Sequence, residues 1–118
     1  VGVDFSAAMI DSARRQHPQL RFVVADAHDL SQLDTQFDAI ILSDLVNDAW
    51  DVQALLSGLQ RLCHSGTRIV LNFYSRLWEM PLKAAAQAGL ARPVLKQNWL
   101  TVDDVVNLLH LSFDAGRA

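Results

Sequence analysis

The stretch VGVDFSAAMIDSARR, residues 1–15, decides the fold class because it places a short strand directly before a helix. Residues 1–4 are apolar and β-branched, as in a strand, and Ser6 can cap a helix that His17-Pro18 would end. The inward face of that helix would carry Met9, Ile10 and Ala13. Asp4 thereby stands at the carboxyl end of a strand, the edge at which α/β sheets bind their ligands.

The same alternation of strands and helices continues along the chain. Further strands are expected over residues 20–25, 37–43 and 67–73, and the nearly continuous apolar character of the first two predicts burial on both faces. Helices are expected over residues 52–63, where apolar residues fall at helical spacing before Ser65-Gly66, over 81–88, and from a Thr101 cap onward. This order predicts an α/β fold with a doubly wound, mostly parallel sheet.

Composition limits the classes of protein to consider. The 118 residues are 51% hydrophobic and 19% charged, which suits one globular domain or part of one. The net charge of −3 and the scattered basic residues argue against nucleic acid as the main partner. Cys63 is the single cysteine, and no apolar run reaches membrane length, so a soluble chain without a membrane span, in the reducing cytoplasm, is expected.

Two acidic residues follow successive predicted strands. Asp4 can accept hydrogen bonds from both hydroxyls of an adenosine ribose, or it can simply support the Ser6 cap. Asp26 can accept from the exocyclic amine of adenine, or it can form a local turn in the loop that follows. Both interpretations of each residue stay open on the sequence alone.

Three segments carry a resemblance to a family. GVDFSAAMIDSARR, LRFVVADAHDL and QFDAIILSDLVND resemble the Rossmann-like S-adenosylmethionine-dependent methyltransferases. The resemblance implies methyl transfer from S-adenosylmethionine, with residues 1–118 forming a partial cofactor-binding methyltransferase domain. It implies that Asp4 holds the ribose and Asp26 the adenine. The full set of cofactor-binding residues that it implies is Asp4, Phe5, Met9, Asp26, Ala27, Ser43 and Asp44.

The chain departs from the family pattern at its start. The family's glycine-rich loop is absent and would precede Val1, so the sheet is expected to lack its first, central strand, as well as its last strands. Losing that strand would expose two inner sheet edges. We expect such a fragment to be inactive alone unless a further chain or domain supplies the strand.

A narrower resemblance concerns the methyl acceptor. ILSDLVNDAWDVQALL, NFYSRLWEMPLKAAAQAGL and QNWLTVDDVVNLLHL are similar to bacterial methyltransferases associated with glycosyltransferases. This implies a small-molecule, glycan or lipid-type acceptor. Residues Tyr74, Arg76 and Trp78 could form an acceptor wall, although packing between helices would explain the aromatic residues equally well.

Methyl transfer to a hydroxyl benefits from a general base. Asp44 and Asp48 are the candidates, with His28 a weaker one, while Asp48 and Asp51 could instead cap the following helix. No metal site is expected, because the histidines at 17, 28, 64 and 110 form no i, i+4 pair.

Two other functions remain possible on the sequence. A nicotinamide-dependent oxidoreductase would also place an acid such as Asp4 on a ribose. Short-chain dehydrogenases, however, need a lysine four residues after a tyrosine, and Tyr74 is followed there by Trp78. The other possible function is that of a non-catalytic binding or assembly module.

Overall fold

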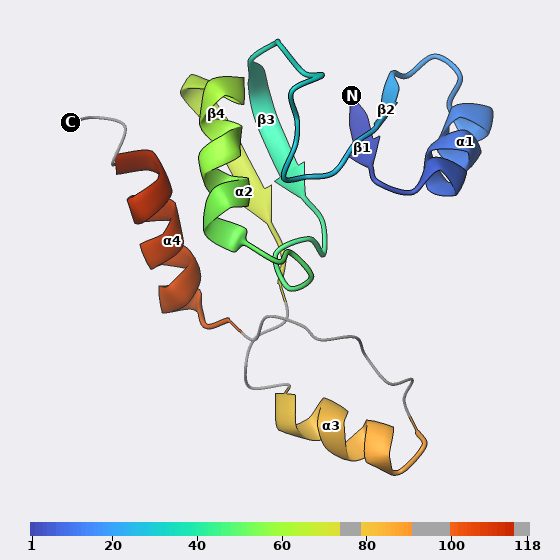
Figure 1. The fold of residues 1–118 in the computed structure, drawn as a ribbon, viewed down its shortest axis with the longest axis vertical. Coiled ribbons are helices and arrows are strands. Elements are labelled where there is room, and N and C mark those ends of the chain that lie inside the picture. The colour runs from blue at the N-terminus through green and yellow to red at the C-terminus, as the bar shows by residue number, and fades with distance from the viewer. Residues whose placement is uncertain (74–78, 91–99, 115–118) are drawn as a thin grey trace.

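The computed structural model describes residues 1–73, 79–90 and 100–114 of the chain, and these form an α/β fold (Figure 1). Strands and helices alternate as the sequence predicts. A 3-10 turn, η1 (Gln60–Leu62), follows the second helix. The elements in order are β1 (Gly2–Asp4), α1 (Ala7–Gln16), β2 (Phe22–Val24), β3 (Phe37–Leu42), α2 (Val52–Leu59), β4 (Cys63–Leu71), α3 (Glu79–Gln87) and α4 (Val102–Asp114).

The strands form two separate parallel pairs. β1 pairs with β2 and β3 pairs with β4, and within the described residues no ladder joins one pair to the other. Figure 1 shows the two pairs beside each other, with α1 against the first pair and α2 in front of the second. Each described strand therefore has one unpaired edge. The prediction of parallel strands in an α/β fold is confirmed.

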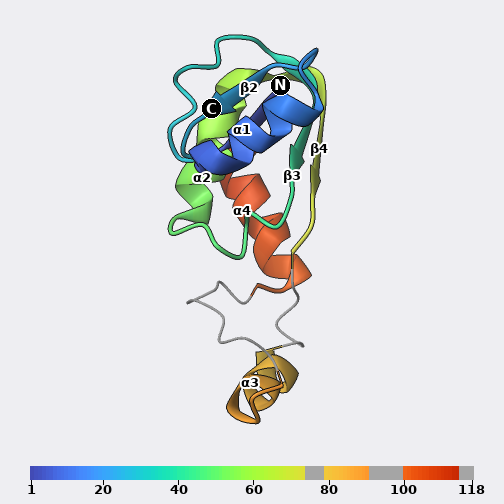
Figure 2. The ribbon, with the colours of Figure 1, turned by 90° about the vertical axis from the view of Figure 1, so that its right-hand side faces the viewer.

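The core lies between α2 and one face of the β3–β4 pair. Leu55, Leu56 and Leu59 of α2 are fully buried because they repeat at helical spacing and face the sheet. α4 adds Leu108 and Leu109 from the outside of this layer. Figure 2 shows α2 and α4 together on one side of β3 and β4. None of the described helices is long and apolar enough to cross a membrane.

The predicted helix caps are present. The Ser6 hydroxyl accepts from the Met9 N–H, and the Asp51 carboxylate accepts from the Ala54 N–H at 2.9 Å. Asp51 is therefore a capping residue. Thr101 and Asp104 form a reciprocal capping box at the start of α4, in which each side chain accepts from the other's backbone N–H.

The boundary between α2 and β4 differs from the prediction. The α-helix ends at Leu59, and β4 begins at Cys63, so Cys63 belongs to a strand and Ser65-Gly66 lies inside that strand. The apolar spacing runs on through the 3-10 turn, which made the helix look longer than it is. Pairing of Cys63 with Phe37 of β3 fixes the strand start.

Two burial predictions were also wrong. Ile41 of β3 was expected to be buried but is 73% exposed. Its paired neighbour Val70 of β4 is 56% exposed as well, so the second face of this pair is not covered by the described residues. Met9 was expected on the inward face of α1 and is 62% exposed, whereas Ile10 beside it is buried. In the described part of the chain, one side of the sheet lacks its second layer.

Candidate functional site

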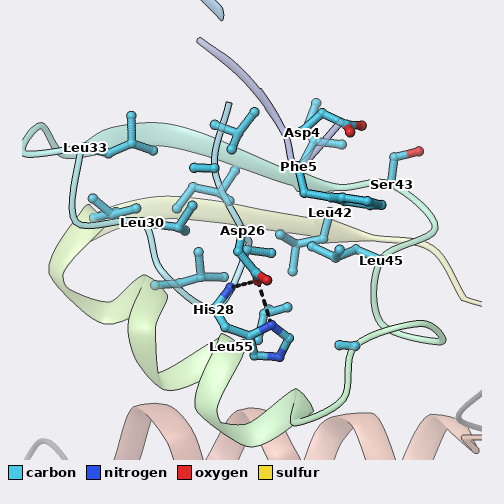
Figure 3. Close-up of a pocket in the computed structure, with 18 of the residues that line it drawn as sticks. Asp4, Phe5, Asp26, His28, Leu30, Leu33, Leu42, Ser43, Leu45 and Leu55 are labelled. Carbon is cyan, nitrogen blue, oxygen red and sulfur yellow. Dashed lines mark hydrogen bonds and ion pairs between the residues drawn. The ribbon is translucent and has the colours of Figure 1, made fainter. Parts of the chain in front are cut away.

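A cavity of about 670 Å³ lies between the two strand pairs and opens where the strands end (Figure 3). Its apolar lining includes Val3 of β1 and Ile41 of β3. Its polar part consists of side chains that follow three different strands, because the carboxyl ends of parallel strands meet at one edge. These polar residues are Asp4, Asp26, His28, Ser43, Asp44 and Asp48.

Asp4 supports the start of α1 and also lines the cavity. Its Oδ1 accepts from the Ser6 N–H at 2.8 Å, which supports the start of α1. The capping bond leaves Oδ2 for a ligand, and Asp4 lines the cavity together with Phe5. Figure 3 shows both side chains at the mouth of the cavity.

Asp26 is held by His28. Asp26 Oδ1 accepts from the His28 N–H at 2.8 Å and lies 2.9 Å from His28 Nδ1 (Figure 3). The backbone N–H of His28, and secondly its ring, hold the pKa of Asp26 below the ordinary value of 3.8. Asp26 is therefore an anion at neutral pH and can only accept hydrogen bonds, as binding to an amine requires.

The ring of His28 joins the loop after β2 to the start of α2. Its Nε2 lies 3.1 Å from the Asp51 carbonyl and 3.3 Å from the Asp51 nitrogen. The ring also stacks on Trp50, with centroids 4.4 Å apart. Both ring nitrogens and one face of the His28 ring are therefore engaged in contacts within the protein. These contacts indicate that His28 joins the two loops, a structural role that explains its position better than a role as general base.

Asp44 has an unusual backbone conformation at the end of β3. Its φ of 52° is positive, in the left-handed region that few non-glycine residues occupy. Asn72, just after β4, pairs with it twice: the Asp44 N–H donates to Asn72 Oδ1, and Asn72 Nδ2 donates to Asp44 Oδ1, each at 2.7 Å. Sequence reasoning missed Asn72, because an asparagine after a strand gives no distinctive signal.

The side chains that line the cavity give it a negative charge. Four carboxylates line it, those of Asp4, Asp26, Asp44 and Asp48, and its described lining contains no lysine or arginine. Such a surface favours neutral or cationic ligands and disfavours phosphates. Within the described residues, no group of three metal-ligating side chains is present.

The predicted site residues fall into three groups. Asp4, Phe5, Asp26, Ala27, Ser43, Asp44 and Asp48 all line the cavity. Met9 instead lies at a smaller hollow between α1 and the β1–β2 pair, with Ile10 and Phe22. The proposed acceptor residues Tyr74, Arg76 and Trp78 lie outside the described residues.

Comparison with known proteins supports the resemblance to methyltransferases. A family described as "Methyltransferase domain" matches residues 1–71, which is more than half of the chain. The chain belongs to this methyltransferase domain family. Its fold resembles that of a Thermotoga maritima S-adenosylmethionine-dependent methyltransferase, a possible histamine N-methyltransferase, with a TM-score of 0.75, 15% identity, and coverage of 94% of this chain and 52% of that one.

Curated relatives agree with this assignment over part of their length. A demethylmenaquinone methyltransferase of Beutenbergia cavernae is 35% identical over 75 residues, 64% of this chain and 31% of the relative. One of Streptomyces avermitilis is 30% identical over 92 residues, 78% of this chain and 40% of the relative. The chain thus spans well under half the length of these relatives.

The family implies S-adenosylmethionine as the cofactor, as predicted. The cavity volume lies within the usual range of about 300–1,000 Å³ for small-molecule sites. Its carboxylates can accept from hydroxyl and amino groups, and apolar Phe5 and Ala27 can contact a flat ring. The residues present therefore fit the adenosine part of such a cofactor.

Proposed function

We propose that this chain is part of an enzyme that transfers a methyl group from S-adenosylmethionine to a small-molecule or lipid-type acceptor. In the proposed complex, Asp4 accepts from the ribose hydroxyls and Asp26 from the adenine amine, while Ser43 and Asp44 lie toward the methionine side. The sulfonium of the cofactor supplies an activated methyl group, so the protein's part is to orient the two reactants. The observation that carries this proposal is the meeting of Asp4, Asp26 and Asp44 in one cavity.

The charge of the cavity favours this function over nicotinamide chemistry. A nicotinamide dinucleotide carries a pyrophosphate, which is normally held by backbone N–H groups or cations. Four carboxylates without a lysine or arginine in the described lining would repel it. S-adenosylmethionine carries no phosphate and has a positive sulfonium, so the same surface suits it.

The acceptor is proposed from the relatives and from the cavity. The named relatives are demethylmenaquinone methyltransferases, and apolar side chains such as Leu30, Leu33 and Leu45 form part of the cavity lining here. We propose an apolar acceptor with a ring hydroxyl, in which Asp44 or Asp48 would take the hydroxyl proton. The hydroxyl oxygen would then bond to the methyl carbon as the S–CH3 bond breaks, and S-adenosylhomocysteine would leave as the neutral thioether. A glycan or lipid-linked sugar is the alternative acceptor and would be methylated on its own hydroxyl.

We also propose that a further strand completes the sheet between β1 and β3. Both strands have an unpaired edge, and Val3 and Ile41 line the space between the pairs. The curated relatives are about two to three times as long as the matched segment, so such proteins have chain to supply a strand. Residues 1–118 alone would then bind cofactor weakly and be inactive.

Calorimetry with S-adenosylhomocysteine tests the proposal. The chain carried upstream through its natural coding sequence, called the extended chain below, should bind, and residues 1–118 alone should bind much more weakly. Asp4→Ala should weaken binding by about tenfold or more, since charge-assisted hydrogen bonds contribute about 1.5–3 kcal/mol. The matched control is Asp11→Ala, an exposed acid of α1 paired with Arg14. Binding of a nicotinamide dinucleotide instead would contradict the proposal.

A further inference from the structure

The pairing of Asn72 with Asp44 is more specific than strand packing requires. The β3–β4 register already aligns Leu42 with Leu71, and the Asn72 N–H donates to the Leu42 carbonyl. The two additional bonds, from the Asp44 N–H and to the Asp44 carboxylate, fix both the backbone and the side chain of one residue. Asn72 itself does not line the cavity, whereas Asp44 does.

An amide side chain can make both bonds at once. Asn72 donates through Nδ2 and accepts through Oδ1, which a carboxylate or an apolar side chain cannot do. The pair holds Asp44 at a positive φ, a conformation that persists only where the surrounding structure enforces it. Because Asn72 Nδ2 donates to Asp44 Oδ1, the pairing restricts the position of the Asp44 carboxylate.

We infer that Asn72 is a positioning residue that fixes the Asp44 carboxylate so that the site favours the cationic sulfonium of the cofactor over the neutral thioether of the product. This inference rests on the proposed function. A fixed anion attracts S-adenosylmethionine and loses that attraction once the methyl group and the positive charge have left, so it also favours product release. Asn72 acts only through Asp44.

The test compares the affinities of two ligands for the extended chain without an acceptor. Dissociation constants for S-adenosylmethionine and S-adenosylhomocysteine are measured by calorimetry for the wild type, Asn72→Ala and Asp44→Asn. Asp44→Asn removes the charge but keeps both pairing groups, and asparagine tolerates a positive φ. We expect each variant to reduce the preference for S-adenosylmethionine by about fivefold, the effect of about 1 kcal/mol at a solvated site.

The double variant separates positioning from a general structural role. In the Asp44→Asn background, Asn72→Ala should change the ratio of the two dissociation constants by less than twofold, because no charge remains to be positioned. If Asn72→Ala weakens both ligands equally, or leaves the ratio unchanged while Asp44→Asn alters it, the inference is wrong. An unaltered ratio in Asp44→Asn also overturns it. If the extended wild type binds neither ligand, the proposed function itself fails, which is a separate result.

Discussion

Replacing His28 should destabilise the chain more than replacing any exposed histidine, because His28 joins two loops at the cavity. Its side chain is only 12% exposed. His28→Ala removes a hydrogen bond between Nε2 and the Asp51 backbone, which contributes about 1 kcal/mol, and stacking on Trp50, which contributes about 0.5–1 kcal/mol. The contact with Asp26 adds less, because water solvates that carboxylate. The expected loss in free energy of unfolding is about 2 kcal/mol.

The matched control for this variant is His110→Ala. His110 Nδ1 lies 2.9 Å from Asp114 Oδ2, the same distance as in the His28–Asp26 pair, but both partners are exposed on α4. We expect its unfolding free energy to stay within about 0.5 kcal/mol of the wild type. Urea unfolding of the extended chain, followed by far-ultraviolet circular dichroism, measures both. Equal changes in unfolding free energy for the two variants would refute the structural role of His28 in joining the two loops.

Three further predictions concern a cap, a titration and the uncovered sheet face. Thr101→Ala removes one half of the capping box with Asp104 and should lower the unfolding free energy by about 1 kcal/mol in the same urea assay, with Thr101→Ser restoring most of it. Because contacts from His28 lower the pKa of Asp26, the stability it provides is present above its unfolded pKa and lost as pH falls through the lower folded pKa. Wild type and Asp26→Asn should therefore differ at pH 7 and converge in acid; a constant difference would contradict this. Ile41→Asp should change the stability of residues 1–118 by less than about 0.5 kcal/mol but destabilise the extended chain by about 2 kcal/mol or more, if additional chain covers that face.

Much of the fold could be predicted because its signals are local. The caps at Ser6, Asp51 and Thr101 depend on residues within one helical turn, and all three are present. The start of β4 could not be predicted in the same way, because it depends on the pairing of Cys63 with Phe37, which lies far away in the sequence. Local periodicity continued past the helix end and gave no sign of that pairing.

The residues of the candidate site can likewise be divided into those that the sequence predicts and those that it does not. Acidic residues after strands are visible in the sequence, so Asp4, Asp26 and Asp44 could be predicted as cavity residues. Their supporting partners could not, because Asn72 meets Asp44, and His28 meets Asp51, only after the strands have been aligned. An asparagine or histidine in a loop is too common to indicate a role by itself. What the sequence missed is therefore the layer that orients the predicted acids.

The exposure of Ile41 in β3, a strand that was predicted to be buried on both faces, is informative. Strands with apolar residues on both faces are typical of parallel sheets that are covered on both sides. Here Leu42 and Leu71 face the core, while Ile41 and Val70, one position earlier on each strand, pair on the opposite face and are exposed. A sequence adapted to one covered face would place polar residues at those two positions. The pattern therefore fits a sheet that is covered on both faces.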